Sequence, residues 1–290
     1  MKRTTLVFLK LGGSLISDKR KPASFRRKTV ARIGREIAEA LKGDDSLRLL
    51  IGHGGGAAAH FPAAKHRTAS GLPGGGGWRG FAETRRGVLT MNRRVLDALA
   101  EGGLHPVLVP PVASVVCRNG RIAQWDTCVI ETLLAADQLP LIHGDAVLDR
   151  TLGFTICSTE TLFAFLAGRL KPARIVLASD VEGVYLEKSE PPRGVELVPC
   201  GRGRARVRCV HPGNFAALRK RLRDATPSDR KADVTGGMAA KVEQLYEMTR
   251  SRPELHGRIV SGLRRGEVTA ALLGEDVGTE VCGTPPARAG

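Results

Sequence analysis

The stretch Leu6-Val7-Phe8-Leu9-Lys10-Leu11-Gly12-Gly13-Ser14 decides the fold, because it predicts a buried strand over residues 5–11 that runs into a glycine loop. The two glycines allow backbone N–H groups to approach an anion closely, where any Cβ would collide. Lys10 and the later Lys19 add positive charge. The order differs from a Walker loop, in which the lysine follows the glycines. The stretch therefore predicts a phosphate site of another kind.

Helical and extended patterns alternate along the chain, which predicts an α/β fold with a mainly parallel sheet covered by helices on both faces. Ligands in such sheets bind at the carboxyl edge of the strands. Residues 71–80 are expected to form a loop. The expected strands are 5–11, 47–51, 106–109, 139–149, 154–157, 174–179, 258–260 and 270–273, and the expected helices are 29–42, 82–101, 159–168 and one that opens near Gly237.

Two further glycine loops accompany side chains that suit phosphate chemistry. Gly52-His53-Gly54-Gly55-Gly56 follows the strand 47–51 and leads to His60 near a helix start, and Asp233-Val234-Thr235-Gly236-Gly237 precedes Lys241. Asp180 follows the strand 174–179 at the same expected edge. Each residue has a plainer interpretation, a structural histidine or a solvated lysine. Three glycine loops with three lysines nevertheless favour a site in which negative charge moves between oxygens.

Composition limits the other classes of function. The chain has 290 residues, 42% of them hydrophobic, and no run of the roughly 18 apolar residues that a membrane span needs, so a globular, cytoplasmic protein is expected. Six scattered cysteines without a Cys-x-x-Cys pair indicate reduced thiols and no zinc site. The net charge is +16, and residues 188–231 carry twelve Lys/Arg against four Asp/Glu. This charge, with Pro191-Pro192, Gly201 and Gly203 in the same segment, predicts a basic surface insertion. No specific nucleic-acid partner is expected, because aromatics are only 4% of the chain.

Taken in order, six motifs resemble those of the amino acid kinase superfamily, and within it the isopentenyl phosphate kinases. They are Lys-x-Gly-Gly-Ser at 10–14, Asp-Lys at 18–19, His-Gly-Gly-Gly-x-x-x-His at 53–60, Gly-Asp-x-Val-x-Asp at 144–149, Ser-Asp-Val-x-Gly-Val-Tyr at 179–185 and Asp-Val-Thr-Gly-Gly-Met-x-x-Lys at 233–241. The resemblance implies a three-layer αβα sandwich with a mainly parallel central sheet. It implies a single domain over 1–282, with an acceptor-binding half at about 1–170 and a nucleotide-binding half at about 171–282. The Gly/Pro-rich composition of residues 283–290 predicts a disordered tail.

The resemblance also implies phosphoryl transfer from ATP, with Mg²⁺, to the phosphate of isopentenyl phosphate, a step of isoprenoid biosynthesis, in a homodimer. No protein cage for the metal is expected. Catalysis would fall to Lys10, Lys19, Glu160 and Lys241, acceptor binding to Gly55, His60 and Thr159, and nucleotide binding to Lys10, Gly12, Gly13, Ser14, Gly56, Asp180, Gly237 and Lys241.

Two departures from the family pattern leave alternatives open. Ser158-Thr159-Glu160 stands where the family usually has Ser-Gly-Asp, so Glu160 keeps the charge with one more methylene, while Thr159 adds a side chain on the expected path of the phosphate. Ala57-Ala58-Ala59 replaces Ser-Phe-Gly and leaves that loop small. The alternatives are a fosfomycin kinase, a kinase of another small phosphate or phosphonate acceptor, and a non-catalytic nucleotide- or RNA-binding relative.

Overall fold

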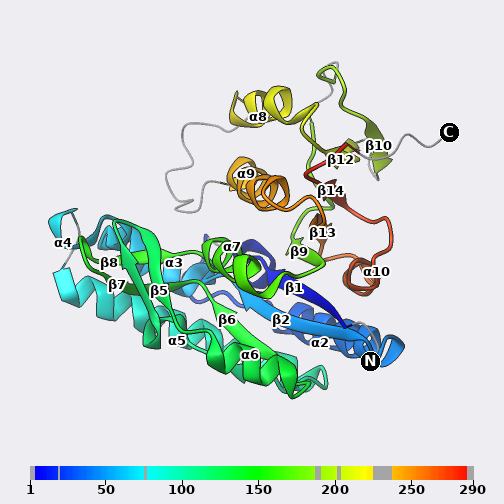
Figure 1. Cartoon of the computed structure of the whole chain (residues 1–290). Coiled ribbons are helices and arrows are strands. Elements are labelled where there is room, and N and C mark those ends of the chain that lie inside the picture. Colours follow the sequence, from blue (N-terminus) through cyan, green and yellow to red (C-terminus); the bar gives the residue numbers. More distant parts are fainter. Residues whose placement is uncertain are drawn as a thin grey trace.

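An eight-stranded sheet forms the centre of the molecule, in the order β12-β14-β13-β9-β1-β2-β6-β3 (Figure 1). The computed structural model describes residues 4–18, 20–74, 77–186, 191–200, 204–224 and 237–285. All neighbouring strands of this sheet are parallel except β13 and β14. The strands are β1 (Thr5–Leu11), β2 (Leu47–His53), β3 (Val107–Leu108), β6 (Pro140–His143), β9 (Arg174–Ser179), β12 (Cys209–Val210), β13 (His256–Ser261) and β14 (Thr279–Val281).

Helices cover both faces of this sheet because its strands are apolar on both sides. Val7 and Leu9 of β1 belong to one core cluster, which also contains side chains of α2 (Arg27–Gly43), α5 (Gly77–Glu101) and α10 (Glu267–Leu273). Phe8 points to the other face, where α6 (Cys128–Ala135), α7 (Thr159–Leu170) and α9 (Gly237–Arg250) supply the core. Figure 1 shows α2 and α5 on one side of the sheet and α7 and α9 on the other. The expected three-layer αβα sandwich is confirmed.

Smaller elements surround this framework. A four-stranded sheet has the order β5-β4-β7-β8, and a two-stranded sheet pairs β10 with β11. These strands are β4 (Val115–Arg118), β5 (Arg121–Trp125), β7 (Asp145–Asp149), β8 (Gly153–Cys157), β10 (Leu197–Cys200) and β11 (Arg204–Val207), and the remaining helices are α1 (Gly13–Ile16), α3 (Gly56–Lys65), α4 (Gly71–Gly74) and α8 (Phe215–Asp224). Within the described residues, no helix has the length and apolar character that a membrane crossing needs.

Some sequence-based boundaries were wrong for local reasons. Residues 270–273, expected as a strand, belong to α10. A short apolar run fits either state, and here Gly266 and Gly274, both with left-handed backbone angles, flank a helix of about two turns. Part of the expected loop at 71–80 is helical, since α4 covers Gly71–Gly74 and α5 begins at Gly77. Of the expected tail, residues 286–290 lie outside the described residues.

The basic segment at 188–231 is partly described, and its described residues are folded against the rest of the chain. They form β10, β11, β12 and α8, and β12 pairs with β14 at one end of the central sheet. Several of its arginines are engaged internally. Arg219 and Arg223 both contact Glu243 at 2.9 Å, and Arg208 contacts Glu196 at 2.9 Å. These ion pairs indicate that several arginines of the segment stabilise the fold.

Candidate active site

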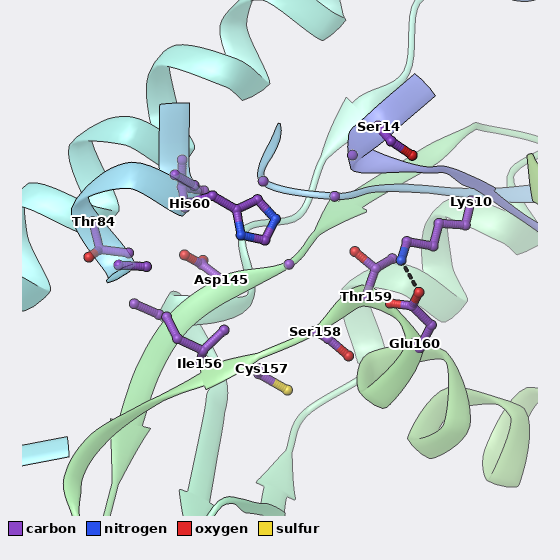
Figure 2. Close-up of a pocket in the computed structure, with 18 of the residues that line it drawn as sticks. Lys10, Ser14, His60, Thr84, Asp145, Ile156, Cys157, Ser158, Thr159 and Glu160 are labelled. Carbon is purple, nitrogen blue, oxygen red and sulfur yellow. Dashed lines mark ion pairs between the residues drawn. The ribbon is translucent and has the colours of Figure 1, made fainter. Parts of the chain in front are cut away.

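Four strands end at the same edge of the central sheet and bring three of the predicted motifs together. In the register of the sheet, Leu11 of β1 lies beside His53 of β2 and Ala178 of β9, and His53 lies beside His143 of β6. The loops that follow therefore meet in one place. A pocket at this edge is lined by eight of the predicted site residues, Lys10, Gly13, Ser14, Gly55, His60, Thr159, Glu160 and Lys241. Figure 2 labels Lys10, Ser14, His60, Thr159 and Glu160 among them.

Lys10 and Glu160 form a buried ion pair in the floor of the pocket (Figure 2). Only 6% of Lys10 and 4% of Glu160 is exposed to solvent. Burial works to raise the pKa of the Glu160 carboxyl, but the charge and hydrogen bond of Lys10, together with the charge of Lys241, outweigh it and hold this pKa below its usual value. Glu160 is therefore an anion that orients Lys10, and it lies close enough to Lys241 to feel its charge.

The first two glycine loops approach each other closely beside this pair. A Cβ on Gly54 would lie 2.9 Å from the backbone nitrogen of Gly13, so only a glycine fits at that position. Ser14, next along, donates its hydroxyl to the Asp180 carboxylate at 2.8 Å. The N–H of Gly12 is already used, because it donates to the Ala178 carbonyl at 2.9 Å. Gly12 thus contributes close packing against β9, while Gly13 and Ser14 line the pocket.

His60 reaches the pocket from the second turn of α3. Figure 2 shows its ring projecting from the helix toward the pocket. The positive end of the α3 dipole lies beside Gly55, the residue that precedes the helix and also lines the pocket. This end of the pocket therefore combines a histidine, a helix N-terminus and the ammonium of Lys10, and it suits an anionic group.

Thr159, which sequence reasoning expected to crowd the phosphate path, is accommodated by a glycine on the neighbouring strand. Its hydroxyl donates to the His53 carbonyl at 2.7 Å. A Cβ on Gly52 would meet Thr159 Cγ2 at 2.6 Å and the Phe163 ring at 2.8 Å. The methyl group of Thr159 thus occupies the space above Gly52, and only 1% of the residue is exposed. The hydroxyl and methyl groups are both engaged with β2.

The opposite end of the pocket is mainly apolar, with Thr84 and Asp145 as polar members, and sequence reasoning did not assign its residues. It is lined by Ala59 and Ala63 of α3, Val88 of α5 and Ile156 of β8. In Figure 2, Thr84 and Ile156 lie on the far side of His60 from Lys10 and Glu160. The helical spacing of Ala59 and Ala63 was the available signal, but it does not tell which face of α3 meets a cavity. The pocket therefore has a charged end and an end lined mainly by hydrocarbon groups.

A second ion pair, also unassigned from sequence, joins a partly buried arginine to a buried aspartate at the mainly apolar end. Arg85 of α5 contacts Asp145 at the start of β7, and the Val112 N–H donates to the same carboxylate at 3.2 Å. Burial raises the pKa of Asp145 to about 6 in spite of Arg85. Burial likewise lowers the pKa of His143 and of His53 to about 4, so both imidazoles are neutral at pH 7. Asp145 belonged to a quoted motif, and its contacts explain the motif structurally.

The remaining predicted residues lie around the pocket, with one outside the described residues. Gly56 opens α3, and Gly237 opens α9 one turn before Lys241. Asp180 reaches the pocket through Ser14. Lys19 and residues 233–236 lie outside the described parts of the chain. Within the described residues, no group of three or more His, Cys, Asp or Glu side chains could hold a metal ion.

Comparisons with known proteins show the family of the chain. The profile of the amino acid kinase family matches residues 5–260. The chain belongs to the amino acid kinase family. An isopentenyl phosphate kinase from Methanothermobacter thermautotrophicus is 31% identical over 96% of this chain and 99% of its own length. One from Methanocaldococcus jannaschii is 29% identical over 95% of this chain and 98% of its own. These relatives place this family member in the isopentenyl phosphate kinase branch, as the six motifs predicted.

Solved structures agree with the fold of this kinase. A structure of an isopentenyl phosphate kinase superposes with a TM-score of 0.72 and 28% identity, over 95% of this chain and 99% of that one. A carbamate kinase from Giardia lamblia bound to AMP-PNP superposes with a TM-score of 0.65 at 16% identity, over 97% of this chain and 99% of that one, which shows the shared fold alone. Family and fold together make this chain a small-molecule kinase.

Proposed function

We propose that this kinase transfers the γ-phosphoryl group of ATP to the phosphate of isopentenyl phosphate, giving isopentenyl diphosphate and ADP. One observation carries the proposal: a single pocket places the buried Lys10, together with His60 and Lys241, around a charged end, and mainly apolar side chains at the other end. An acceptor with a phosphate head and a short hydrocarbon tail matches both ends. The near full-length relatives are isopentenyl phosphate kinases, which supports the same acceptor.

The reaction forms one bond and breaks one. An oxygen of the acceptor phosphate attacks the γ-phosphorus of ATP, and the bond from that phosphorus to the β,γ-bridging oxygen breaks as ADP leaves. Such transfers depend on positioning and on neutralising charge on the moving oxygens. Lys10 would contact the transferring phosphoryl group, held in place by Glu160. Lys241, at the pocket edge on α9, would contact the nucleotide phosphates, with Gly237 at the start of the same helix beside them.

On the acceptor side, His60 would bind the acceptor phosphate, with Gly55 and the N-terminus of α3 beside it. Thr159 would border the acceptor without donating to it, since its hydroxyl is bonded to His53. Lys19 is proposed as the stabiliser of transition-state charge from its motif alone. Mg²⁺, when bound, would neutralise charge on the nucleotide phosphates, and such ions are commonly held by substrate phosphates and waters with few protein ligands. Asp180 would act at the nucleotide by fixing Ser14.

An acceptor panel tests the proposal. Purified protein with Mg-ATP is assayed for ADP release with isopentenyl phosphate, dimethylallyl phosphate, fosfomycin, carbamate and glutamate, each over a range of concentrations. The expected result is a kcat/KM for isopentenyl phosphate at least tenfold above that for each non-isoprenoid acceptor. A preference for fosfomycin would reassign the acceptor, and no turnover with any of them would remove the proposal.

Matched variants make the same assay specific to the pocket. Lys10→Ala should lower kcat by about two to three orders of magnitude, the usual effect of removing one preorganised charge donor. Lys42→Ala, at an exposed position in the last turn of α2, should leave kcat unchanged. Chelation of Mg²⁺ should abolish turnover, and addition of Mg²⁺ should restore it. The homodimer implied by the resemblance stays a prediction, which light scattering after gel filtration would check.

A further inference from the structure

Two buried cysteines meet at the end of the central sheet that lies away from the pocket. Cys209 is on β12, and Cys282 directly follows β14. Their Sγ atoms are 3.1 Å apart although the residues are 73 positions apart in the chain. Only 7% of Cys209 and 5% of Cys282 is exposed. A separation this short brings two thiols into direct contact, and it is unrelated to the phosphate chemistry of the pocket.

The strand pairing explains why both sulfurs are on the same side. Cys209 lies beside Glu280 in the parallel pairing of β12 and β14. Side chains alternate along a strand, so Cys282, two residues after Glu280, points to the same face as Cys209. The Cys282 N–H donates to the Val210 carbonyl at 2.9 Å, which fixes its backbone against β12. A disulfide would need the sulfurs to approach by only about 1 Å, to the usual S–S distance of about 2.05 Å.

The surroundings assign different roles to the two thiols. The hydrogen bond between the two sulfurs, together with one from the Thr284 N–H, lowers the pKa of Cys282 despite burial. The same hydrogen bond, with burial, raises the pKa of Cys209. Cys282 is therefore the sulfur that becomes a thiolate first, and the thiolate is the nucleophile in disulfide exchange. The pair has an attacking thiol and a resolving thiol in contact.

We propose that Cys209 and Cys282 are a redox modification site, which a low-molecular-weight disulfide converts to an intramolecular disulfide that fastens β12 to β14. In the first step the Cys282 thiolate attacks one sulfur of the reagent, whose S–S bond breaks to release one thiolate. In the second, Cys209 gives up its proton and attacks Cys282 Sγ, which releases the second reagent thiolate. Two protein thiols and one external disulfide thus become one protein disulfide and two external thiols.

The disulfide would also restrain β14, the strand that contacts the loop beginning at Asp180. Thr279 on β14, three residues before Cys282, accepts from the Val184 N–H at 2.9 Å and donates to the Val207 carbonyl at 2.6 Å. β14 therefore links that loop to β11, and the disulfide would tie the same strand to β12. The disulfide would then join β12 covalently to the residue that follows β14. The inference does not depend on which acceptor the kinase uses.

The full chain, kept folded at 25 °C, is equilibrated in glutathione buffers of increasing oxidised fraction, quenched with an alkylating reagent and mapped by peptide mass spectrometry. The expected result is a Cys209–Cys282 linkage that dithiothreitol reverses, with a melting temperature about 5–10 °C above that of the reduced protein, the order expected for closing so long a loop. No such linkage at any ratio, or linkage without a thermal shift, would overturn the proposal.

Serine variants show whether the shift belongs to this pair. Cys209→Ser and Cys282→Ser should each abolish the difference between oxidised and reduced protein, whereas Cys128→Ser, at an exposed cysteine on α6, should keep it. A shift that survives Cys209→Ser would assign the effect to other cysteines and contradict the proposal. If one variant fails to fold, the other variant and the peptide map of the unmodified chain decide the question.

Discussion

Glu160→Gln removes the negative partner of a buried ammonium while keeping the shape of the side chain. Lys10 is only 6% exposed, so its ammonium group cannot be solvated when Glu160 is neutralised. Breaking one side of a buried ion pair usually costs about 3–5 kcal/mol. For a chain of this length, roughly 2 °C per kcal/mol then gives a melting temperature about 6–10 °C lower. Differential scanning calorimetry without ligand measures this fall.

A nucleotide should reverse part of this loss, because its phosphates replace the missing carboxylate beside Lys10. A saturating non-hydrolysable ATP analogue should therefore raise the melting temperature of Glu160→Gln by more than it raises that of the unmodified chain. Glu182→Gln is the matched control, since Glu182 pairs with Arg264 at 3.4 Å on the surface and should change stability by less than about 0.5 kcal/mol. The reasoning is refuted if Glu160→Gln has the same melting temperature as the unmodified chain, or if the nucleotide raises its melting temperature by less.

Three further perturbations are predicted. His60→Ala should raise the KM for the acceptor at least tenfold and leave the KM for ATP within about twofold, and equal effects on both would contradict its assignment to the acceptor. The pKa values of His53 and His143 are about 4 in the folded protein against 6.5 for a free imidazole, so each histidine removes about 3 kcal/mol of stability as the pH falls from 6.5 to 4. The pKa of Asp145 is raised to about 6, so its protonation adds a similar amount of stability over the same range and cancels the loss from one histidine. Urea unfolding at pH 7 and pH 4 should show a net loss of about 3 kcal/mol, and a flat profile would contradict buried neutral imidazoles. Gly52→Ala should lower stability by about 1–3 kcal/mol, because its Cβ would collide with side chains of α7. An unchanged urea midpoint would show that α7 shifts to make room and would contradict this prediction.

The framework of the site could be predicted from the sequence because the motifs that form it are local. A buried strand followed by two glycines is visible in residues 6–14, and the structure has β1 at Thr5–Leu11 as predicted. Parallel strands share a carboxyl edge, so the motifs after β1, β2 and β9 could be expected to converge. Lys10, His60 and Lys241, more than two hundred positions apart at the extremes, do line one pocket.

What sequence reasoning missed depends on contacts between distant residues. Thr159 alone suggested an obstacle, and only the three-dimensional neighbourhood shows that Gly52 makes room for its methyl group. The Arg85–Asp145 pair and the Cys209–Cys282 contact join segments whose spacing carries no signal. Residues 270–273 failed for another reason, because a four-residue apolar run has the period of neither a strand nor a helix.

The most direct test of the central claim is the identity of the product. In ³¹P NMR of the unmodified enzyme with Mg-ATP and isopentenyl phosphate, the account predicts that the acceptor resonance is replaced by the two coupled resonances of a diphosphate ester, in equal amount to the ADP formed. Release of ADP together with inorganic phosphate, and an unchanged acceptor resonance, would contradict it.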